Sequence, residues 1–312
     1  PEVRQVLEDG IPDCWPELRP IFDTIFALPP PLLSVAILPL VSCHAVNGTA
    51  REAVPVSAAL IAAEVSLRIF DDLEDKDIPG QLWELLGEAR AWNYASAIHI
   101  LSFEILSKAS FYTQIFRKVN QLFIDAFFYI TVGQERDLIG LSNSIEDYWR
   151  TIELKTATAY SAACASGAIV GTENPELIEA CGTFGHNVGL AIQIFNDMES
   201  IWQPDGITDL KPGKITLPLL YGLPSQHPER DELLSLVTDN EIATHAERIK
   251  EILDNIDPKS FLIWAALKER EQALEAIKIC PNAEGKEVLE SYITGMFGDI
   301  DLLLEKPAGD KT

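Results

Sequence analysis

The chain has 312 residues, of which 47% are hydrophobic and 23% charged, so it carries enough apolar side chains for a large buried core. Its formal net charge of −24 argues against nucleic acid as a partner, because binding a phosphate backbone requires clustered basic residues. A small anionic ligand would also be repelled unless metal ions and a few lysines reversed the charge locally. If the ligand is a phosphate compound, we therefore expect metal ions to hold it.

The five cysteines are scattered, odd in number and contain no CxxC pair (Cys14, Cys43, Cys164, Cys181, Cys280). We therefore expect free thiols and a cytoplasmic location rather than a disulfide framework or a zinc site. No segment resembles a removable targeting sequence. The longest apolar run, residues 32–41, is too short to span a bilayer and contains Ser34 and Pro39, so it predicts a buried helix and no transmembrane segment.

Apolar residues recur at three- and four-residue spacing through most of the chain, which predicts helices, whereas signals for strands are sparse. A polar loop containing Pro212 is expected at residues 206–213. No internal repeat and no linker rich in Gly and Ser is present, so we predict one all-α domain over residues 1–312. The expected helices, in chain order, are 54–75, 90–112, 114–139, 145–171, 175–203, 216–222, 230–237, 240–254, 258–278 and 284–304.

Small side chains line the predicted helix 54–75, and two interpretations of them stay open. They either allow close helix packing or leave a channel for a long apolar ligand. Five phenylalanines in the next two helices could line the same channel or belong to the core. The small residues are Ala58, Ala59, Ala62, Ala63 and Ser66, and the phenylalanines are Phe103, Phe111, Phe123, Phe127 and Phe128.

The first acidic cluster ends this helix with Asp71, Asp72 and Asp75 in a DDxxD pattern. Residues at i and i+4 share one face of a helix, so these carboxylates can converge on a hard divalent cation such as Mg²⁺. The ordinary alternative is a solvated acidic face. The apolar pair Ile69-Phe70 directly before the cluster indicates partial burial, where crowded carboxylates need cations to neutralise them.

A second, weaker cluster lies 125 residues later and consists of Asn196, Asp197 and Ser200, with Gln193 one turn earlier. It is either a polar helix end before Pro204 or a second metal site with carboxylate, amide and hydroxyl ligands. Two such faces pointing at each other would form a cage for metal ions and a diphosphate.

Cations for a phosphate could come from Lys155, which precedes Thr156, and from Lys214 in the segment 209–218. A lone lysine is ordinarily a surface residue, but this chain has only 24 basic residues, which makes Lys214 a candidate phosphate contact. The sequence contains no GxSxG, P-loop or GxGxxG motif, and its five histidines have no metal-ligand spacing.

Taken together in order, these residues resemble the all-trans isoprenyl diphosphate synthases, or polyprenyl synthetases, of the class I isoprenoid synthase superfamily. The resemblance covers roughly residues 30–225. Its landmarks are Asp71-Asp72-x-x-Asp75, Leu82-Trp83 with Gly87 and Ala91-Trp-Asn93, Gly133-Gln134 with Asp137-Leu138, Lys155-Thr156, residues 193–200, and the DLxxGKxTLP-like segment 209–218.

The resemblance implies a bundle of helices around a deep apolar cavity, three Mg²⁺ ions held with the diphosphate, and a homodimer. It implies that an allylic isoprenyl diphosphate of C15–C20 ionises at the metal ions, while apolar walls keep water from the cation. The implied metal ligands are Asp71, Asp72, Asp75, Asn196, Asp197 and Ser200. The implied catalytic residues are Lys155, Thr156, Gln193 and Lys214, with the lysines and Gln193 contacting the diphosphate.

The chain departs from the family in the residues that hold isopentenyl diphosphate. Residues 30–35 carry no basic residue where the family has a GKxxRP segment, and residues 76–80 lack the pair of arginines that follows the first motif. We therefore expect isopentenyl diphosphate to be a poor acceptor. Ser66, five residues before Asp71, replaces an aromatic residue that often stops chain growth, which indicates room beyond C15.

Several functions stay open at this point. The first is transfer of the prenyl group to an acceptor that the sequence does not identify. The DDLED segment followed by Leu82-Trp83 is similar to the ComQ-type isoprenyl transferases, which prenylate a tryptophan in a peptide. The second is a class I terpene cyclase, because Asn196-Asp197-x-x-Ser200 is similar to the NDxxS start of the cyclase motif, although Pro204 stands where an acid is expected. The third is an inactive partner subunit of a prenyl synthase.

Overall fold

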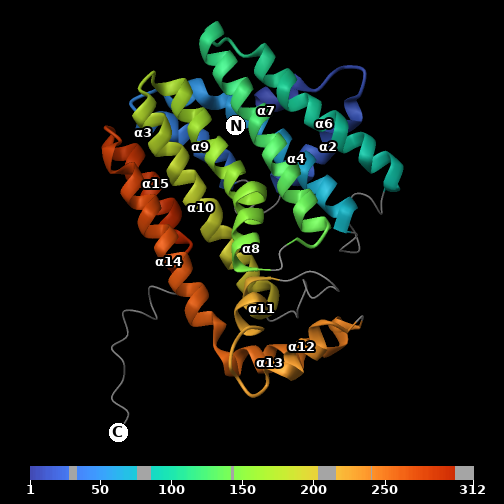
Figure 1. Cartoon of the computed structure of the whole chain (residues 1–312). Coiled ribbons are helices and arrows are strands. Elements are labelled where there is room, and N and C mark those ends of the chain that lie inside the picture. Colours follow the sequence, from blue (N-terminus) through green and yellow to red (C-terminus); the bar gives the residue numbers. More distant parts are fainter. Residues whose placement is uncertain (28–33, 76–85, 142–143, 203–215, 240, 299–312) are drawn as a thin grey trace. The chain divides into compact units, whose positions relative to one another are not determined.

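The computed structural model describes residues 1–27, 34–75, 86–141, 144–202, 216–239 and 241–298 (Figure 1). Throughout these ranges the regular elements are helices and no strand occurs, so the all-α prediction is confirmed. The side chains of residues 24–27, Ser34 and Asp75 lie outside the description although their backbones are helical.

The backbone contacts divide the chain into two compact units, each assembled from three segments. Unit 1 comprises Pro1–Asp125, Ala162–Gly182 and Ile277–Leu289, and unit 2 comprises Ala126–Ser161, Thr183–Ala276 and Glu290–Thr312. Four of the five boundaries fall inside helices, namely α7 (Thr113–Leu138), α9 (Thr158–Gly171), α10 (Pro175–Trp202) and α15 (Ala283–Gly295). The fifth falls where α14 (Pro258–Ala276) ends. A single domain over residues 1–312 stays a prediction.

Unit 1 contains the first acidic cluster, at the end of its long helix α4. Beside parts of α7, α9, α10 and α15, its elements are α1 (Glu2–Gly10), η1 (Pro16–Leu18), α2 (Arg19–Ala27), α3 (Ser34–Ala45), η3 (Ala50–Ala53), α4 (Val54–Asp75), α6 (Glu88–Lys108) and η6 (Ile277–Ile279). Helices α4 and α6 pack along each other (Figure 1). The small residues Ala58, Ala59, Ala62 and Ala63 of α4 are at most 1% exposed, which confirms close helix packing at these positions.

One helical stretch of the described chain, Ala50–Glu74, is long and apolar enough to cross a membrane by length and composition alone. However, 72% of its apolar window is buried inside the protein, so it serves as a core helix of unit 1. The buried helix expected in residues 32–41 is present as α3, and Cys14 is exposed whereas the other four cysteines are free and buried.

The phenylalanines proposed as cavity lining or core do not share one environment. Phe123 is 2% exposed and belongs to the core of unit 1. Phe128 is 72% exposed on the outer face of α7, so neither interpretation is correct for it.

Unit 2 contains the second cluster and the lysine–threonine pair. Its elements are the rest of α7, α8 (Ile145–Ile152), η4 (Glu153–Ala157), the start of α9, most of α10, α11 (Leu217–Gly222), α12 (Arg230–Val237), η5 (Ile242–His245), α13 (Ala246–Ile256), α14 (Pro258–Ala276) and the end of α15. Ser144 is the N-cap of α8, since its hydroxyl accepts a hydrogen bond from the Asp147 amide at 3.0 Å.

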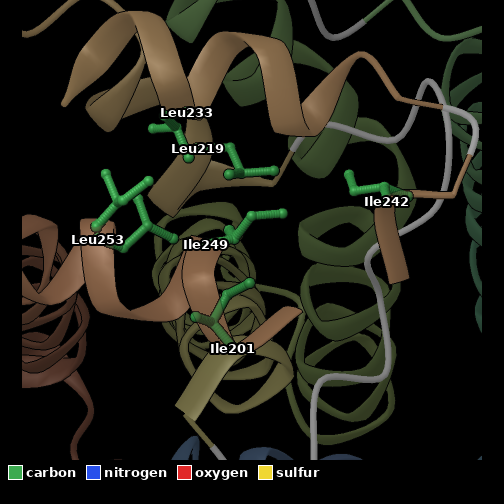
Figure 2. Packing of buried hydrophobic residues seen from close by; sticks show 7 residues of the cluster. Ile201, Leu219, Leu233, Ile242, Ile249 and Leu253 are labelled. Carbon is green, nitrogen blue, oxygen red and sulfur yellow. The ribbon is translucent and has the colours of Figure 1, made fainter. Parts of the chain in front are cut away.

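A buried hydrophobic cluster joins the end of α10 to α11, α12, η5 and α13 (Figure 2). Its members are at most 1% exposed: Ile201, Leu219, Leu233, Ile242, Ile249, Ile252 and Leu253. Since Ile201 directly follows Ser200, this cluster fixes the helix end that carries the second motif.

Some predicted boundaries were wrong. The helix expected at 145–171 is interrupted by η4, a single π-helical turn. The helix expected at 90–112 spans Glu88–Lys108. Of the helix expected at 284–304, α15 covers Ala283–Gly295, and residues 299–304 lie outside the described part of the chain. Helices α1 and α2 were not predicted. The other expected helices occur within a few residues of their predicted bounds, with 240–254 observed as η5 and α13.

Candidate functional site

The first acidic motif occupies the last turn of α4 in unit 1. Asp71 and Asp72 are half-buried, and Leu73 between the acidic residues is 3% exposed. The motif therefore begins where the buried face of α4 ends, as the apolar residues before it predicted. The side chain of Asp75 lies outside the described part of the chain.

The turn before this motif packs against α6. The ring of Phe70 lies 5.4 Å from that of Trp92 and 6.4 Å from that of His99, both on α6. A hydrogen bond of 3.1 Å joins the Ser66 hydroxyl to Nδ1 of His99. Burial lowers the pKa of His99, which favours the neutral imidazole.

This packing shows what lies beside Ser66, while the expected room for chains beyond C15 stays a prediction. Ser66 is 0% exposed, because the imidazole of His99 occupies the space beside its short side chain. Sequence spacing could not reveal this, since His99 comes from another helix.

In unit 2, Lys155 and Thr156 lie on the π-helical turn η4, which is packed closely from two sides. A Cβ atom on Gly133 of α7 would lie 2.4 Å from the Lys155 nitrogen. A Cβ atom on Gly189 of α10 would lie 2.7 Å from Cα of Ala157. Only glycine permits both approaches of backbone to backbone, so these two residues fix the position of η4. A π-helical turn is a common feature of functional sites.

The ammonium group of Lys155 is held by Asp137, with Nζ 2.9 Å from Oδ2. Both side chains are about a quarter exposed, at 26% and 24%. The Asp of the Gly133-Gln134…Asp137-Leu138 motif thus orients the lysine of the next motif. The sequence did not predict this role for Asp137.

A chain of hydrogen bonds connects η4, α10 and α11. The Thr156 hydroxyl donates to Oε1 of Gln193 at 2.9 Å, and Nε2 of Gln193 donates to Oδ1 of Asp197 at 2.9 Å. The backbone amide of Leu217, the first residue of α11, donates to Oδ2 of Asp197 at 2.9 Å. We call this chain, from Thr156 through Gln193 and Asp197 to the Leu217 amide, the relay.

Tyr148 of α8 is 4% exposed and lies near the relay. Burial raises the pKa of Tyr148 well above its usual range, and the carboxylates of Asp197 and Asp137 act in the same direction. Its hydroxyl therefore stays protonated. No sequence pattern pointed to Tyr148.

The three predicted ligands of the second motif lie in different environments. Asn196 is exposed, whereas Asp197 and Ser200 are each 5% exposed. The Ser200 hydroxyl donates to the backbone oxygen of Asp197 at 2.9 Å, within its own helix. Glu199 is exposed three residues after Asn196 and was not among the predicted ligands, although that spacing places both on one helix face.

Two parts of the predicted site lie outside the described residues: Lys214 with its segment 203–215, and the side chain of Asp75. Among the side chains that are described, no group of three or more His, Cys, Asp or Glu residues is arranged to hold a metal ion. Asp71 and Asp72 would need Asp75 to complete a trio of carboxylates.

Comparison with known proteins identifies the family. The model of the family described as polyprenyl synthetase matches residues 37–256, more than half of the chain. The chain belongs to the polyprenyl synthetase family. The matched range includes α4, η4 and α10, and therefore both acidic motifs and the relay.

Individual members of the family are similar to the chain at modest identity. A geranylgeranyl diphosphate synthase of Mycobacterium tuberculosis is 29% identical over 214 residues, which cover 64% of this chain and 61% of that protein. The match thus spans about three fifths of that relative. A short chain isoprenyl diphosphate synthase of Methanothermobacter thermautotrophicus is 27% identical over 268 residues, 81% of each chain.

A solved polyprenyl synthetase structure shows the same fold. The geranylgeranyl pyrophosphate synthase from Corynebacterium glutamicum, complexed with calcium and isoprenyl diphosphate, superimposes with a TM-score of 0.79. It is 20% identical and covers 96% of this chain and 94% of its own. The isoprenoid synthase fold expected from the sequence is thereby confirmed.

Proposed function

We propose that this protein is a Mg²⁺-dependent prenyltransferase that ionises an allylic isoprenyl diphosphate of C15–C20 and transfers the prenyl group to an acceptor. The proposal rests on one observation: in unit 2, hydrogen bonds join residues that belong to separate family motifs. Asp137 holds Lys155, and the relay joins Thr156 to Gln193, Asp197 and Leu217. Such preorganisation is expected of a catalytic site.

The acidic residues supply the donors that a hard divalent cation prefers. Asp71 and Asp72 are half-buried carboxylates, and Asn196 offers an exposed amide oxygen. We propose that Asp71, Asp72 and Asp75 hold Mg²⁺. Asn196 and Ser200 stay predicted ligands of the second motif, whereas the Asp197 carboxylate already accepts from Gln193 and Leu217. When bound, Mg²⁺ supplies charge stabilisation to the departing diphosphate. The Corynebacterium glutamicum synthase is complexed with calcium and isoprenyl diphosphate, which supports a divalent cation and a prenyl diphosphate as ligands here.

The residues of the chain divide the remaining work. Lys155 offers the diphosphate an ammonium group from the fixed turn η4, and we propose that Lys214 offers a second. Thr156 and Gln193 are half-buried dipoles whose oxygen atoms can face a positive charge on the prenyl group. These four groups would each stabilise developing charge, and removal of one such preorganised contact typically costs about 3–4 kcal/mol of the barrier reduction.

The acceptor is the least constrained part of the proposal. We propose that isopentenyl diphosphate is disfavoured, because residues 30–35 and 76–80 lack the basic residues that bind it in the family. Most of these residues lie outside the described structure. The named relatives are diphosphate synthases, which makes isopentenyl diphosphate the first acceptor to test.

The test is a product assay with purified protein, Mg²⁺ and farnesyl or geranylgeranyl diphosphate, with and without isopentenyl diphosphate. Diphosphate release is followed, and organic products are identified by mass spectrometry. We expect Mg²⁺-dependent release with little elongation. Longer diphosphates formed at low micromolar isopentenyl diphosphate would overturn the acceptor proposal, and a cyclised hydrocarbon from one substrate would identify a terpene synthase. Absence of release with every acceptor would favour a partner subunit.

A matched pair of variants ties activity to the first motif. Asp72→Asn should lower diphosphate release at least a hundredfold and raise the Mg²⁺ concentration needed for half-maximal rate. Asp231→Asn, the same substitution at a side chain that is 88% exposed, should leave both unchanged. Equal effects of the two variants would argue against a metal site at Asp72.

We further propose a cytoplasmic homodimer. Helix α7 exposes Ile124, Phe128 and Tyr129 at 44%, 72% and 52%, and contiguous exposed apolar side chains commonly mark an interface. Light scattering should give twice the chain mass of 34.5 kDa, and Phe128→Glu should reduce it toward one chain. A monomeric wild-type protein at micromolar concentration would exclude this proposal.

A further inference from the structure

The hydrogen bonds of the relay have a fixed donor-to-acceptor direction, which is set at its Leu217–Asp197 end. At one end stands the backbone amide of Leu217, which can only donate a hydrogen bond. Next to it stands the carboxylate of Asp197, which can only accept when ionised. Each of its two oxygens accepts from one N–H donor, Oδ1 from Nε2 of Gln193 and Oδ2 from the Leu217 amide.

The direction passes along the relay to Thr156. Because Asp197 accepts, Gln193 must present its amino group to it and its carbonyl oxygen to Thr156. Because that carbonyl accepts, Thr156 must donate its single hydroxyl proton to Gln193. The remaining positions on the half-buried Thr156 oxygen are lone pairs, which attract a positive charge.

We propose that Asp197 is a positioning residue that sets the polarity of the relay, so that Thr156 presents lone pairs rather than a proton to the cation formed from the allylic substrate. This inference rests on the proposed function and assigns to Asp197 a role distinct from metal binding. Asp197 acts through Gln193 and Thr156 and touches no substrate itself.

The position of Asp197 supports this role. Its side chain is 5% exposed, whereas Asn196 next to it is exposed. Its carboxylate accepts hydrogen bonds from Gln193 of α10 and from Leu217 of α11. Helix α11, which begins at Leu217, follows in the sequence the segment that carries Lys214. A buried carboxylate with donors on both oxygens is well placed to orient neighbours and poorly placed to exchange them for a metal ion.

The substitution Asp197→Asn tests polarity without changing shape. The Leu217 amide still donates, so the asparagine oxygen must face it and the asparagine amino group must face Gln193. Gln193 then turns over, presents its own amino group to Thr156, and Thr156 must accept. The hydroxyl proton of Thr156, no longer donated to Gln193, is then free to point toward the cation, which it would destabilise.

The kinetic test uses farnesyl diphosphate and Mg²⁺. Asp197→Asn should lower kcat for diphosphate release about tenfold to hundredfold, while KM for farnesyl diphosphate and the half-maximal Mg²⁺ concentration stay within about threefold. A large rise in the Mg²⁺ requirement would show that Asp197 is a metal ligand and would overturn the inference. Wild-type kinetics in the variant would also overturn it.

A double-mutant cycle tests whether Asp197 acts through Thr156. In a Thr156→Val background, which has no hydroxyl to orient, Asp197→Asn should cost less than threefold. In a Thr156→Ser background, which keeps the hydroxyl, the full loss should return. Equal losses in both backgrounds would contradict the relay.

Two structural readouts separate this inference from the proposed function. Hydrogen exchange of the Leu217 amide should stay slow in Asp197→Asn, which shows that the fold is retained, and should become fast in Asp197→Ala. The side-chain amide resonances of Gln193 should shift in Asp197→Asn as the group turns over. If wild type releases no diphosphate, the proposed function fails, while an unchanged Gln193 spectrum would sink the polarity inference alone.

Discussion

The two acidic motifs share their spacing in the sequence, but the turns around them are built differently. In unit 1 the turn before Asp71 is held by apolar and ring contacts, such as the one between Phe70 and Trp92. In unit 2 the residues around Asp197 are held by directed hydrogen bonds from Gln193 and Leu217. Apolar packing fixes where a helix ends but not which way a dipole points, whereas a bonded network fixes both.

Similar spacing therefore need not mean similar roles. Asp71 and Asp72 are placed at the end of a buried face, where carboxylates can serve a cation. Asp197 is already committed to two protein donors. The following predictions test this contrast, in order of decreasing expected effect.

The largest loss is expected from the hydrophobic cluster that holds the end of α10. Leu253→Ala removes a side chain that is 0% exposed and should lower the free energy of unfolding by about 2–5 kcal/mol. Leu234→Ala, at a position that is 40% exposed, should change it by less than about 0.5 kcal/mol. Urea unfolding measures both. Similar values for the two variants would show that the cluster does not anchor this region.

The next effect concerns the glycines that flank η4. Gly189→Ala places a methyl group against the backbone of Ala157 and should cost about 1–3 kcal/mol of stability. It should also lower diphosphate release strongly, because Lys155 and Thr156 move with η4. The control is Gly295→Ala, where nothing lies within 4 Å of an added Cβ atom, and which should be neutral or slightly stabilising. Retained activity in Gly189→Ala would mean that the position of η4 is not critical.

In unit 1, the packing of His99 can be tested through the pH dependence of stability. Burial lowers the folded-state pKa of His99 below the unfolded value of about 6.5, so the unfolded chain binds the proton more readily. Stability should therefore be full above pH 6.5 and fall as the pH drops from 6.5 toward the folded pKa, by at most about 1.4 kcal/mol per pH unit. His99→Gln should flatten this slope in unfolding experiments at several pH values. His186 contributes in the same direction, since burial lowers its pKa as well. An unchanged slope in His99→Gln would assign the effect to other groups.

The smallest effect on stability is expected at the ion pair of Lys155 and Asp137. Asp137→Asn should cost less than about 1 kcal/mol, because both side chains are partly exposed. It should nevertheless raise KM for the allylic diphosphate about three- to tenfold, since the flexible lysine is no longer held in place. Steady-state kinetics beside urea unfolding separate the two quantities. A lowered KM would show that Asp137 competes with the substrate for Lys155.

Sequence patterns predicted much of the fold for a physical reason. The apolar spacing of a helix is local, so α4, α7 and α10 were located within a residue or two. The π-helical turn at Glu153–Ala157 was not predictable, because its neighbours are Gly133 and Gly189, which come from other helices.

The site was predictable to a similar depth. Short motifs selected Asp71, Asp72 and Lys155 as candidate residues of the site. The partner of Asp197 is the amide of Leu217, 20 residues further along the chain, and the partner of Ser66 is His99, 33 residues away. Spacing within one helix carries no information about such contacts, so the relay and the filled space beside Ser66 emerged only in three dimensions.

The segmented composition of unit 1 has a consequence for how the chain folds during synthesis. Unit 1 is not complete until residues 277–289 are made, and Asn282 then bonds its amide to the carbonyl of Ala45 at 3.1 Å. At ordinary translation rates the ribosome needs roughly 8–30 s to pass from Asp125 to Ile277. During that interval the apolar helix α3 lacks its final neighbour Gly285 of α15, which packs against the backbone of Ala45. Its transient exposure makes the nascent chain a natural client for chaperones and its early fragments prone to aggregate.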